Sequence, residues 1–132
     1  MAVLWTFRCY VSTTGKDEIR DWHDRQSEEV QGRFLSRLRM LAQLPFQEWN
    51  ENLYKNLHGP CAGLSEIRFK ADRVQQRPLG YRNGEREFTF LFCATEKGGK
   101  FVPPSACPTA LARKEDVVTR RCNTNALWLA LE

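Results

Sequence analysis

Hydrophobic and polar residues alternate along several stretches of the chain, and this spacing of two is typical of β-strands that bury one face. The stretches expected to be strands are 3–11, 64–71, 73–81 and 87–95. Within 64–71, Ile67 and Phe69 would face the core, whereas the residues that alternate with them are charged. The stretch 87–95 is apolar on both sides, which predicts the central and most buried strand.

A different spacing, with apolar residues every three or four positions, predicts helices. The clearest pattern runs from Val30 to Ala42, where Ser27 can cap the first turn and Pro45 must end the helix. A shorter helix is expected over 16–26, and a third over 106–119. The shorter helix depends on packing against the rest of the protein for its stability.

Turn signals separate these elements. Thr14 is expected to cap the first helix, and Asn83-Gly84 is the strongest hairpin signal because both residues tolerate positive φ. Pro78 lacks a backbone N–H, so the strand that contains it should be bulged or lie at an edge. The apolar tail, 125–132, should dock on the body of the protein as a strand or as a helix.

The expected order is strand, helix, helix, three strands and helix, which indicates an α+β fold. Because the later strands are joined by short connections, they should form an antiparallel sheet. We expect two N-terminal helices to pack on one face of this sheet, followed by a C-terminal helix, and the opposite face to stay open. The 132 residues fit a single domain, 1–132, without a linker.

Charge and hydropathy narrow the class of partner. Lys and Arg number 20 against 16 Asp and Glu, a net charge of +4 that suits a polyanionic partner without requiring one. The sequence has no apolar run long enough to cross a membrane and no signal-peptide pattern at its start. We therefore expect a protein that is neither secreted nor membrane-spanning.

Cysteine and histidine give no pattern for a metal site or a disulfide framework. The five cysteines are widely spaced, odd in number and form no C-x-x-C pair, so free thiols in a reducing cytosol are expected. His23 and His58 are far apart in the sequence and are interpreted as surface residues.

Cationic residues are expected to gather on the open face of the sheet. They are Arg68 and Lys70 in one strand, Arg77 in the next, and Lys97 and Lys100 in the glycine-rich loop after the central strand. Cations in one concavity repel each other unless an anion binds there. This face is therefore the candidate site.

The long helix carries further positive charge. Its arginines are Arg33, Arg37 and Arg39. They could contact nucleic acid or a partner, but a solvated helix face explains them as well and is the simpler interpretation.

The order of several motifs resembles a known family. The motifs are Leu57-His58-Gly59-Pro60, Gly63-Leu64-Ser65-Glu66-Ile67-Arg68-Phe69, the Arg77 strand, and Phe92-Cys93-Ala94-Thr95-Glu96-Lys97 followed by a Pro- and Ala-containing helix. Together they are similar to the RelE/HigB toxins of type II toxin–antitoxin systems, in particular the phage-derived branch. Ser65 stands where that branch usually has Trp, and Gln76 where it usually has Tyr. The similarity covers Trp5 to Arg113, and 121–132 lies outside it.

The resemblance implies a RelE-like domain that acts as a ribosome-dependent mRNA endoribonuclease and inhibits translation in the cytoplasm. A ribose 2′-hydroxyl would attack the adjacent phosphodiester without a metal or another cofactor. The ribosome and mRNA would be its targets. A cognate antitoxin, typically a helix-turn-helix DNA-binding protein, would hold it inactive.

Such a reaction needs cations on the phosphate, a group that takes the 2′-hydroxyl proton and a proton for the leaving oxygen. The catalytic residues implied by the resemblance are Arg68, Lys70, Arg77 and Lys97, and the residues expected to bind RNA are Arg73, Lys100 and Arg113. Arg68 and Arg77 suit the phosphate because a guanidinium binds two oxygens at once.

The group that transfers the proton stays open. Lys70 or Lys97 could do so if neighbouring cations depress its pKa, since Phe101 cannot exchange protons. Glu66 could act as a base, although a salt bridge to Arg68 or Lys70 is the simpler interpretation.

Two alternatives belong to other classes. One is a non-catalytic protein of RelE-like fold that binds RNA or an antitoxin through the same basic face. The other is a ParE-like gyrase inhibitor, a branch without the catalytic cations, and the presence of Arg68, Lys70 and Lys97 counts against it.

Overall fold

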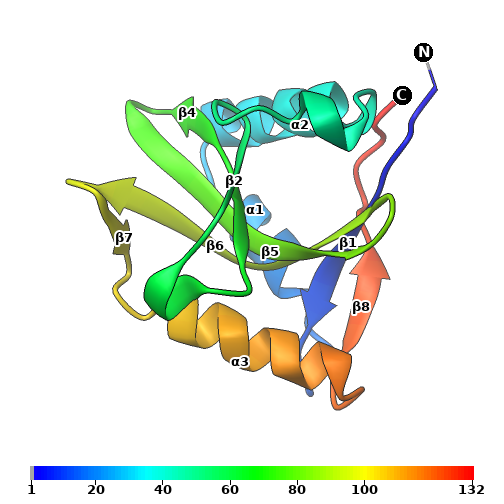
Figure 1. Ribbon diagram of the computed structural model, residues 1–132, viewed down its shortest axis with the longest axis vertical. Coiled ribbons are helices and arrows are strands. Elements are labelled where there is room, and N and C mark those ends of the chain that lie inside the picture. The colour runs from blue at the N-terminus through cyan, green and yellow to red at the C-terminus, as the bar shows by residue number, and fades with distance from the viewer. Residues whose placement is uncertain (1) are drawn as a thin grey trace.

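The computed structural model describes residues 2–132 and alternates short helices with strands (Figure 1). The N-terminal half contains β1 (Thr6–Val11), α1 (Glu18–Asp24), α2 (Glu28–Ala42), the 3-10 turn η1 (Phe46–Glu48), β2 (Tyr54–Asn56), the 3-10 turn η2 (Gly59–Cys61), β3 (Ser65–Ile67) and β4 (Phe69–Ala71). The C-terminal half contains β5 (Val74–Gly84), β6 (Glu87–Lys97), β7 (Lys100–Val102), α3 (Ala106–Val118) and β8 (Asn123–Ala126).

Within residues 2–132, the strands form one mixed sheet in the order β2-β3-β5-β6-β1-β8, with β4 paired to β5 and β7 paired to β6. The β1–β6 pair is parallel, and the other pairs are antiparallel. The expected α+β class with a mostly antiparallel sheet is confirmed, and β6 is a central strand as expected. The docked tail is also confirmed, because β8 pairs with β1.

The helices lie on both faces of the sheet, so the expectation of one open face is wrong. Figure 1 shows α2 on one side of the sheet and α3 on the other. Small side chains of α3, including Ala106 and Ala110, pack against Leu79 and Leu91 of the sheet. The pattern of α3 alone could not show which face it covers, because that depends on where β6 ends.

Capping explains where the first two helices begin. Asp17, and not Thr14, caps α1, because its carboxylate accepts the backbone N–H groups of Ile19 and Arg20. Ser27 caps α2 as expected by accepting from the N–H of Val30. An acidic side chain at this end also suits the positive end of the helix dipole.

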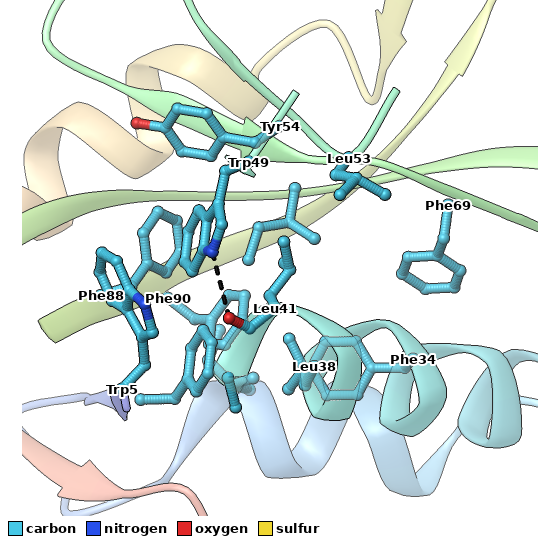
Figure 2. Packing of buried hydrophobic residues seen from close by; sticks show 14 of the residues in the cluster. Trp5, Phe34, Leu38, Leu41, Trp49, Leu53, Tyr54, Phe69, Phe88 and Phe90 are labelled. Atoms are coloured by element: carbon cyan, nitrogen blue, oxygen red, sulfur yellow. Dashed lines mark hydrogen bonds between the residues drawn. The ribbon is translucent and has the colours of Figure 1, made fainter. Parts of the chain in front are cut away.

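The larger core cluster lies between α2 and the sheet and is rich in aromatic side chains. Figure 2 shows Trp49 above Phe88 and Phe90, with Trp5 beside them. The indole Nε1 of Trp49 donates to the carbonyl oxygen of Leu41 at 3.1 Å. A buried indole therefore keeps its hydrogen bond while its ring fills the core.

The expected strand 64–71 is interrupted at Arg68. Glu66 pairs with Leu79 and Phe69 pairs with Gln76, a register that places Ile67, the last residue of β3, opposite Pro78, which has no N–H to offer. The backbone N–H of Arg68 instead donates to a carbonyl outside the sheet. β5 lies inside the sheet and not at its edge, and its own register shift falls at Asn83, beyond the expected stretch that contains Pro78.

A bulge in β6 changes the faces that its aromatic residues occupy. Leu79 pairs with Phe92 and Gly80 pairs with Phe90, so Leu91 has no partner on β5. Phe88 and Phe90 therefore join the core under α2, whereas Phe92 packs on the side of α3. The sequence predicted that side chains along 87–95 alternate between the two faces without a break, and this prediction is wrong beyond Leu91.

The hairpin between β5 and β6 is confirmed, but its turn is displaced. Glu85-Arg86 forms the turn, and Asn83-Gly84 lies at a register shift in the end of β5. Another tight turn, between β4 and β5, is made by Asp72 and Arg73, which both have positive φ. Such a pair is uncommon without glycine, so the sequence did not reveal it.

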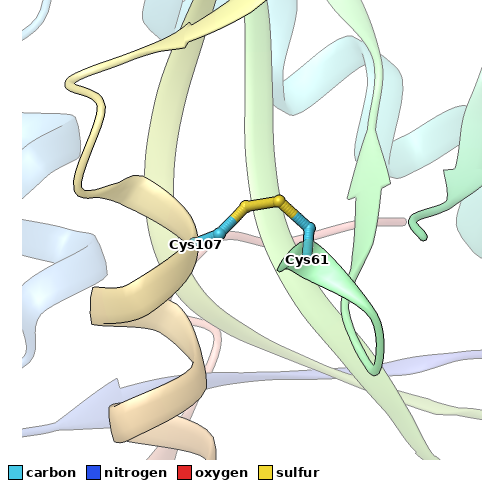
Figure 3. Close-up of a disulfide and its surroundings, with 2 residues drawn as sticks. All are labelled: Cys61 and Cys107. Carbon is cyan, nitrogen blue, oxygen red and sulfur yellow. A yellow bond between two sulfur atoms is a disulfide. The ribbon is translucent and has the colours of Figure 1, made fainter. Parts of the chain in front are cut away.

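Two of the cysteines expected to be free are joined. Figure 3 shows Cys61 of η2 bonded to Cys107 in the first turn of α3, and these residues are 46 positions apart. The expectation of free thiols is wrong for this pair, because the packing of η2 on α3 brings together cysteines that no short motif connects. Cys9, Cys93 and Cys122 are free.

The helices are short and amphipathic. Within the part of the chain that the structure describes, none of them is long and apolar enough to cross a membrane.

Candidate functional site

A polar pocket opens at the edge of the sheet, where β3 ends and β4 begins. Its volume is about 280 Å³, and the residues that line it are Arg37, Asn52, Arg68, Phe69, Lys70, Gln75 and Arg77. Four of these side chains are cationic, and they come from α2, from β4 and its preceding residue, and from β5. A larger pocket of about 460 Å³ lies beside η2 and carries fewer cations, so we take the smaller one as the candidate site.

Strand pairing explains why Glu66, Arg77 and Glu96 meet. Glu66 pairs with Leu79, and Arg77 pairs with Ala94, so these residues point to the same face of the sheet as Glu96. The bulge at Leu91 is required for this arrangement. Without it, Glu96 would point to the opposite face.

Charges of opposite sign alternate beneath the pocket. The Oε2 atom of Glu66 lies 3.0 Å from Nε of Arg68 and 3.2 Å from Nε of Arg77. The same Nε of Arg77 lies 2.9 Å from Oε1 of Glu96. Glu66 therefore joins the two arginines that the sequence placed at the site, as the salt-bridge interpretation anticipated for Arg68.

The two arginines differ in their access to solvent. The side chain of Arg68 is 28% exposed, whereas that of Arg77 is 4% exposed. Arg77 also donates to the carbonyl oxygen of Gln76 at 2.9 Å and to Oε1 of Gln75 at 3.3 Å. Arg68 can therefore contact a ligand directly, whereas Arg77 mainly contributes positive charge to the pocket wall.

Burial acts on two charged groups of the site. It raises the pKa of the Glu66 carboxyl, while the positive charges of Arg77 and Arg68 oppose this shift. Burial also lowers the pKa of the Arg37 guanidinium. In both groups, burial favours the neutral form over the charged one.

Three of the expected site residues are exposed and lie in or beside turns. Lys97 and Lys100 face each other across the β6–β7 hairpin, whose turn is Gly98-Gly99, and Arg73 lies in the β4–β5 turn. None of them is among the described residues that line the pocket. Alternation along β6 places Lys97 on the face opposite to Glu96.

Arg113 is held within the fold. Its Nη1 donates to the carbonyl oxygen of Leu91 at 2.9 Å, and its guanidinium carbon lies 4.8 Å from the ring centre of Tyr10. Glu18 of α1 lies 3.7 Å from its Nη2 atom. These contacts tie α3 to the sheet and to α1, away from the pocket.

The structure adds members to the site that the sequence did not select. They are Arg37, Asn52, Gln75 and Glu96. Only Arg37 carried a signal, as part of the arginine series of the long helix. The others are common polar residues whose position depends on the register of β5 and β6 and on the turn before β2.

Among residues 2–132, no group of three or more His, Cys, Asp and Glu side chains gathers as it would to hold a metal ion. Comparisons of the chain with protein-family models, with curated proteins and with solved structures found no match.

Proposed function

We propose that this protein is the toxin component of a type II toxin–antitoxin system, with a RelE-like fold, and that it cleaves mRNA on the ribosome. The observation that carries the proposal is the pocket that Arg68, Lys70 and Arg77 line together. These are the residues for which the resemblance to RelE/HigB toxins implies a catalytic role. The family assignment itself rests on the sequence motifs.

In the proposed reaction, a ribose 2′-hydroxyl attacks the adjacent phosphodiester, and the bond to the 5′-oxygen of the next nucleotide breaks. Arg68 is the exposed guanidinium that would bind the non-bridging oxygens as negative charge develops on them. Arg77 would stabilise the same charge from the pocket wall. A 2′,3′-cyclic phosphate and a free 5′-hydroxyl would result.

Lys70 is our choice for proton transfer, because it is exposed and lines the pocket. An ammonium group at this place can give a proton to the leaving 5′-oxygen. Lys97 lies beside the turn of the β6–β7 hairpin, outside the pocket. It would take part only if the hairpin moved toward the bound RNA. Glu66 would position Arg68 and would not itself contact the substrate.

The proposed partners follow from the charge of the pocket. An acidic segment of a cognate antitoxin would cover the cations and block the binding of RNA. Co-purification with the chain would identify this antitoxin, which we expect to be a helix-turn-helix DNA-binding protein encoded next to it. The ribosome and its mRNA would be the targets, which places the proposed activity in the cytoplasm.

Brief induction of the chain in growing cells, followed by mapping of mRNA 5′ ends, tests the proposal. The wild-type chain should arrest growth and create new 5′ ends within translated messages. Lys70→Ala and Arg68→Ala should reduce the rate of cleavage by about 100-fold or more, because each removes a proton-transfer or charge-stabilising group. Arg33→Ala, which removes an exposed arginine of α2, is the matched control.

The proposal fails if the wild-type chain, shown to be folded, neither slows growth nor changes the 5′ ends of translated mRNA. It also fails if Lys70→Ala and Arg68→Ala cleave as fast as Arg33→Ala.

A second candidate function is a non-catalytic protein that uses the same pocket to hold RNA or an antitoxin. It is favoured by the contacts of Arg77, whose guanidinium is already engaged by Glu66, Glu96 and Gln75. In addition, the described residues that line the pocket include no His or Tyr. Unchanged mRNA 5′ ends together with tight binding of an antitoxin would support this alternative.

A further inference from the structure

The three arginines of α2 have different surroundings. Arg39 donates from Nε and Nη2 to the carbonyl oxygen of Ala130, both at 3.2 Å, and so fastens the C-terminal segment. Arg33 is exposed. Arg37 instead reaches the pocket that Arg68 and Lys70 also line. A solvated helix face therefore describes Arg33 but not Arg37.

Arg37 and Arg68 are held by neighbouring carbonyl groups of one turn. The Nη1 atom of Arg68 donates to the oxygen of Glu51 at 2.9 Å, and Nη1 of Arg37 donates to the oxygen of Asn52 at 3.3 Å. The backbone N–H of Arg68 also donates to Leu53 at 2.8 Å. Since the same turn holds both side chains, the two guanidinium groups converge on one side of the pocket.

The charges of these two arginines are balanced differently. Arg68 has a carboxylate partner in Glu66, 3.0 Å away. In the described part of the chain, the buried Nε of Arg37 has no hydrogen-bond partner. Burial lowers the pKa of the Arg37 guanidinium. A cationic donor in this state is unfavourable in the free protein and favourable when an anion binds.

We propose that Arg37 and Arg68 together bind one phosphate group of single-stranded RNA, with Lys70 beside it. A tetrahedral phosphate presents oxygens to guanidinium groups that approach from different directions, whereas the two oxygens of a carboxylate lie in one plane. The choice of RNA as the ligand rests on the proposed function. Arg37 binds and positions the strand, while the bond-breaking chemistry stays with the residues of the sheet.

Binding of a short, fluorescently labelled 2′-O-methyl oligoribonucleotide tests this inference. Such a probe lacks the attacking 2′-hydroxyl, so the protein can bind it but cannot cleave it by this route. The test variant is Arg37→Met, which keeps most of the aliphatic stem and removes the charge. The control is Arg33→Met, which makes the same chemical change one helical turn away on an exposed side chain.

Fluorescence anisotropy at several salt concentrations should show that Arg37→Met binds the probe about tenfold more weakly than the wild type at low salt. The slope of log K against log[salt] should fall in magnitude by about 0.7, the value for one phosphate contact of a single strand. Arg33→Met should keep the wild-type affinity and slope. A purely structural role of Arg37 would not change the salt slope in this way.

Arg37→Lys provides a second measurement that does not depend on the folding of the methionine variant. Lysine keeps the charge but not the planar fork, so the salt slope should stay close to that of the wild type while affinity falls. Thermal melts of all variants show whether each one is folded.

The inference is overturned if Arg37→Met and Arg33→Met have the same affinity and slope, or if the folded wild-type protein does not bind the probe. Competition by an acidic peptide that depends on Arg37, without binding of the RNA probe, would assign the site to a protein segment. Failure of the proposed function looks different. It appears as intact mRNA in induced cells, although Arg37-dependent binding of the uncleavable probe persists.

Discussion

Glu66 is buried between two guanidinium groups. Burial favours the neutral form of its carboxyl group, whereas the two guanidinium groups favour the charged form. Its side chain is 4% exposed and lies 3.2 Å from Nε of Arg77 and 3.0 Å from Nε of Arg68. Burial raises the pKa of its carboxyl group, and both arginines act in the other direction. Breaking a buried pair by removing one member leaves an uncompensated charge, which costs more than the intact pair contributes.

Arg77→Met should therefore lower the free energy of unfolding by about 3 kcal/mol at neutral pH, because Glu66 loses one of its partners inside the protein. Without Arg77, the pKa of Glu66 in the folded state should rise further above its value in the unfolded chain. As the pH rises, the unfolded chain then loses the Glu66 proton before the folded protein does. The free energy of unfolding therefore falls as the pH rises from the pKa of Glu66 in the unfolded chain to its pKa in the folded protein. At a pH below the ordinary range of a glutamate, the deficit should shrink.

Urea denaturation of both proteins over a series of pH values measures this effect. Arg33→Met serves as the control and should change stability by less than about 0.5 kcal/mol at every pH. A deficit for Arg77→Met that does not depend on pH would contradict the role of Glu66.

At the scale of elements, the contact between β5 and β6 decides which side chains reach the site. Gly80 lies next to the bulge, where β6 packs close to the backbone of β5. A Cβ atom on Gly80 would lie 2.1 Å from the carbonyl oxygen of Thr89 and 2.7 Å from the ring of Phe88. The backbone of β6 can come this close only because residue 80 has no side chain.

Gly80→Ala should destabilise the protein by about 2 kcal/mol or more, because the strands must separate to accept the methyl group. Gly32→Ala is the matched control, since a Cβ atom there would have nothing within 4 Å and the residue lies in the exposed part of α2. In a helix the same substitution should stabilise by about 1 kcal/mol. Thermal denaturation of the two variants compares them, and equal effects would show that the approach of the strands does not constrain residue 80.

At the scale of the whole molecule, the segment before β3 is fastened to α3 on the face opposite to α2. The disulfide Cys61–Cys107 joins η2 to the first turn of α3. The Nζ atom of Lys114 donates to the carbonyl oxygen of Gly63 at 2.7 Å. These links hold the start of the strand that leads to Glu66 and Arg68, so the site depends on the C-terminal helix without containing any residue of it.

Removing the disulfide with Cys61→Ser should lower the free energy of unfolding by about 4 kcal/mol, the chain-entropy value for a closed loop of this length. The double variant Cys61→Ser/Cys107→Ser should be no less stable than the single one. A reducing agent should lower the denaturation midpoint of the wild type and leave that of the variants unchanged. A wild-type midpoint that does not respond to the reducing agent would contradict this prediction.

Disulfides are rare in a reducing cytosol, so the state of the Cys61–Cys107 bond in cells indicates the compartment in which the protein works. Rapid alkylation of intact cells, followed by mass measurement, shows whether Cys61 and Cys107 are joined there. Thiol titration of the denatured, unreduced protein should find the free thiols of Cys9, Cys93 and Cys122.

Sequence patterns were sufficient where a residue acts through its near neighbours. The periodicity of α2, the cap at Ser27 and the burial of Ile67 and Phe69 all depend on spacings of two to four residues. The cationic character of the 64–77 region could be read in the same way. It identified Arg68, Lys70 and Arg77, which the pocket brings together.

Tertiary structure decided what depends on contacts between distant segments. The bulge at Leu91 brings Glu96 to Arg77, and the turn before β2 brings Arg37 to Arg68. Neither pairing leaves a local signal, because each side chain fits its own strand or helix equally well without the other. The alternation of charge along β3 and β4 therefore predicted a basic face with Glu66 in it, and only the folded chain showed that Glu96 joins this face and that Arg37 adds a fourth cation at its edge.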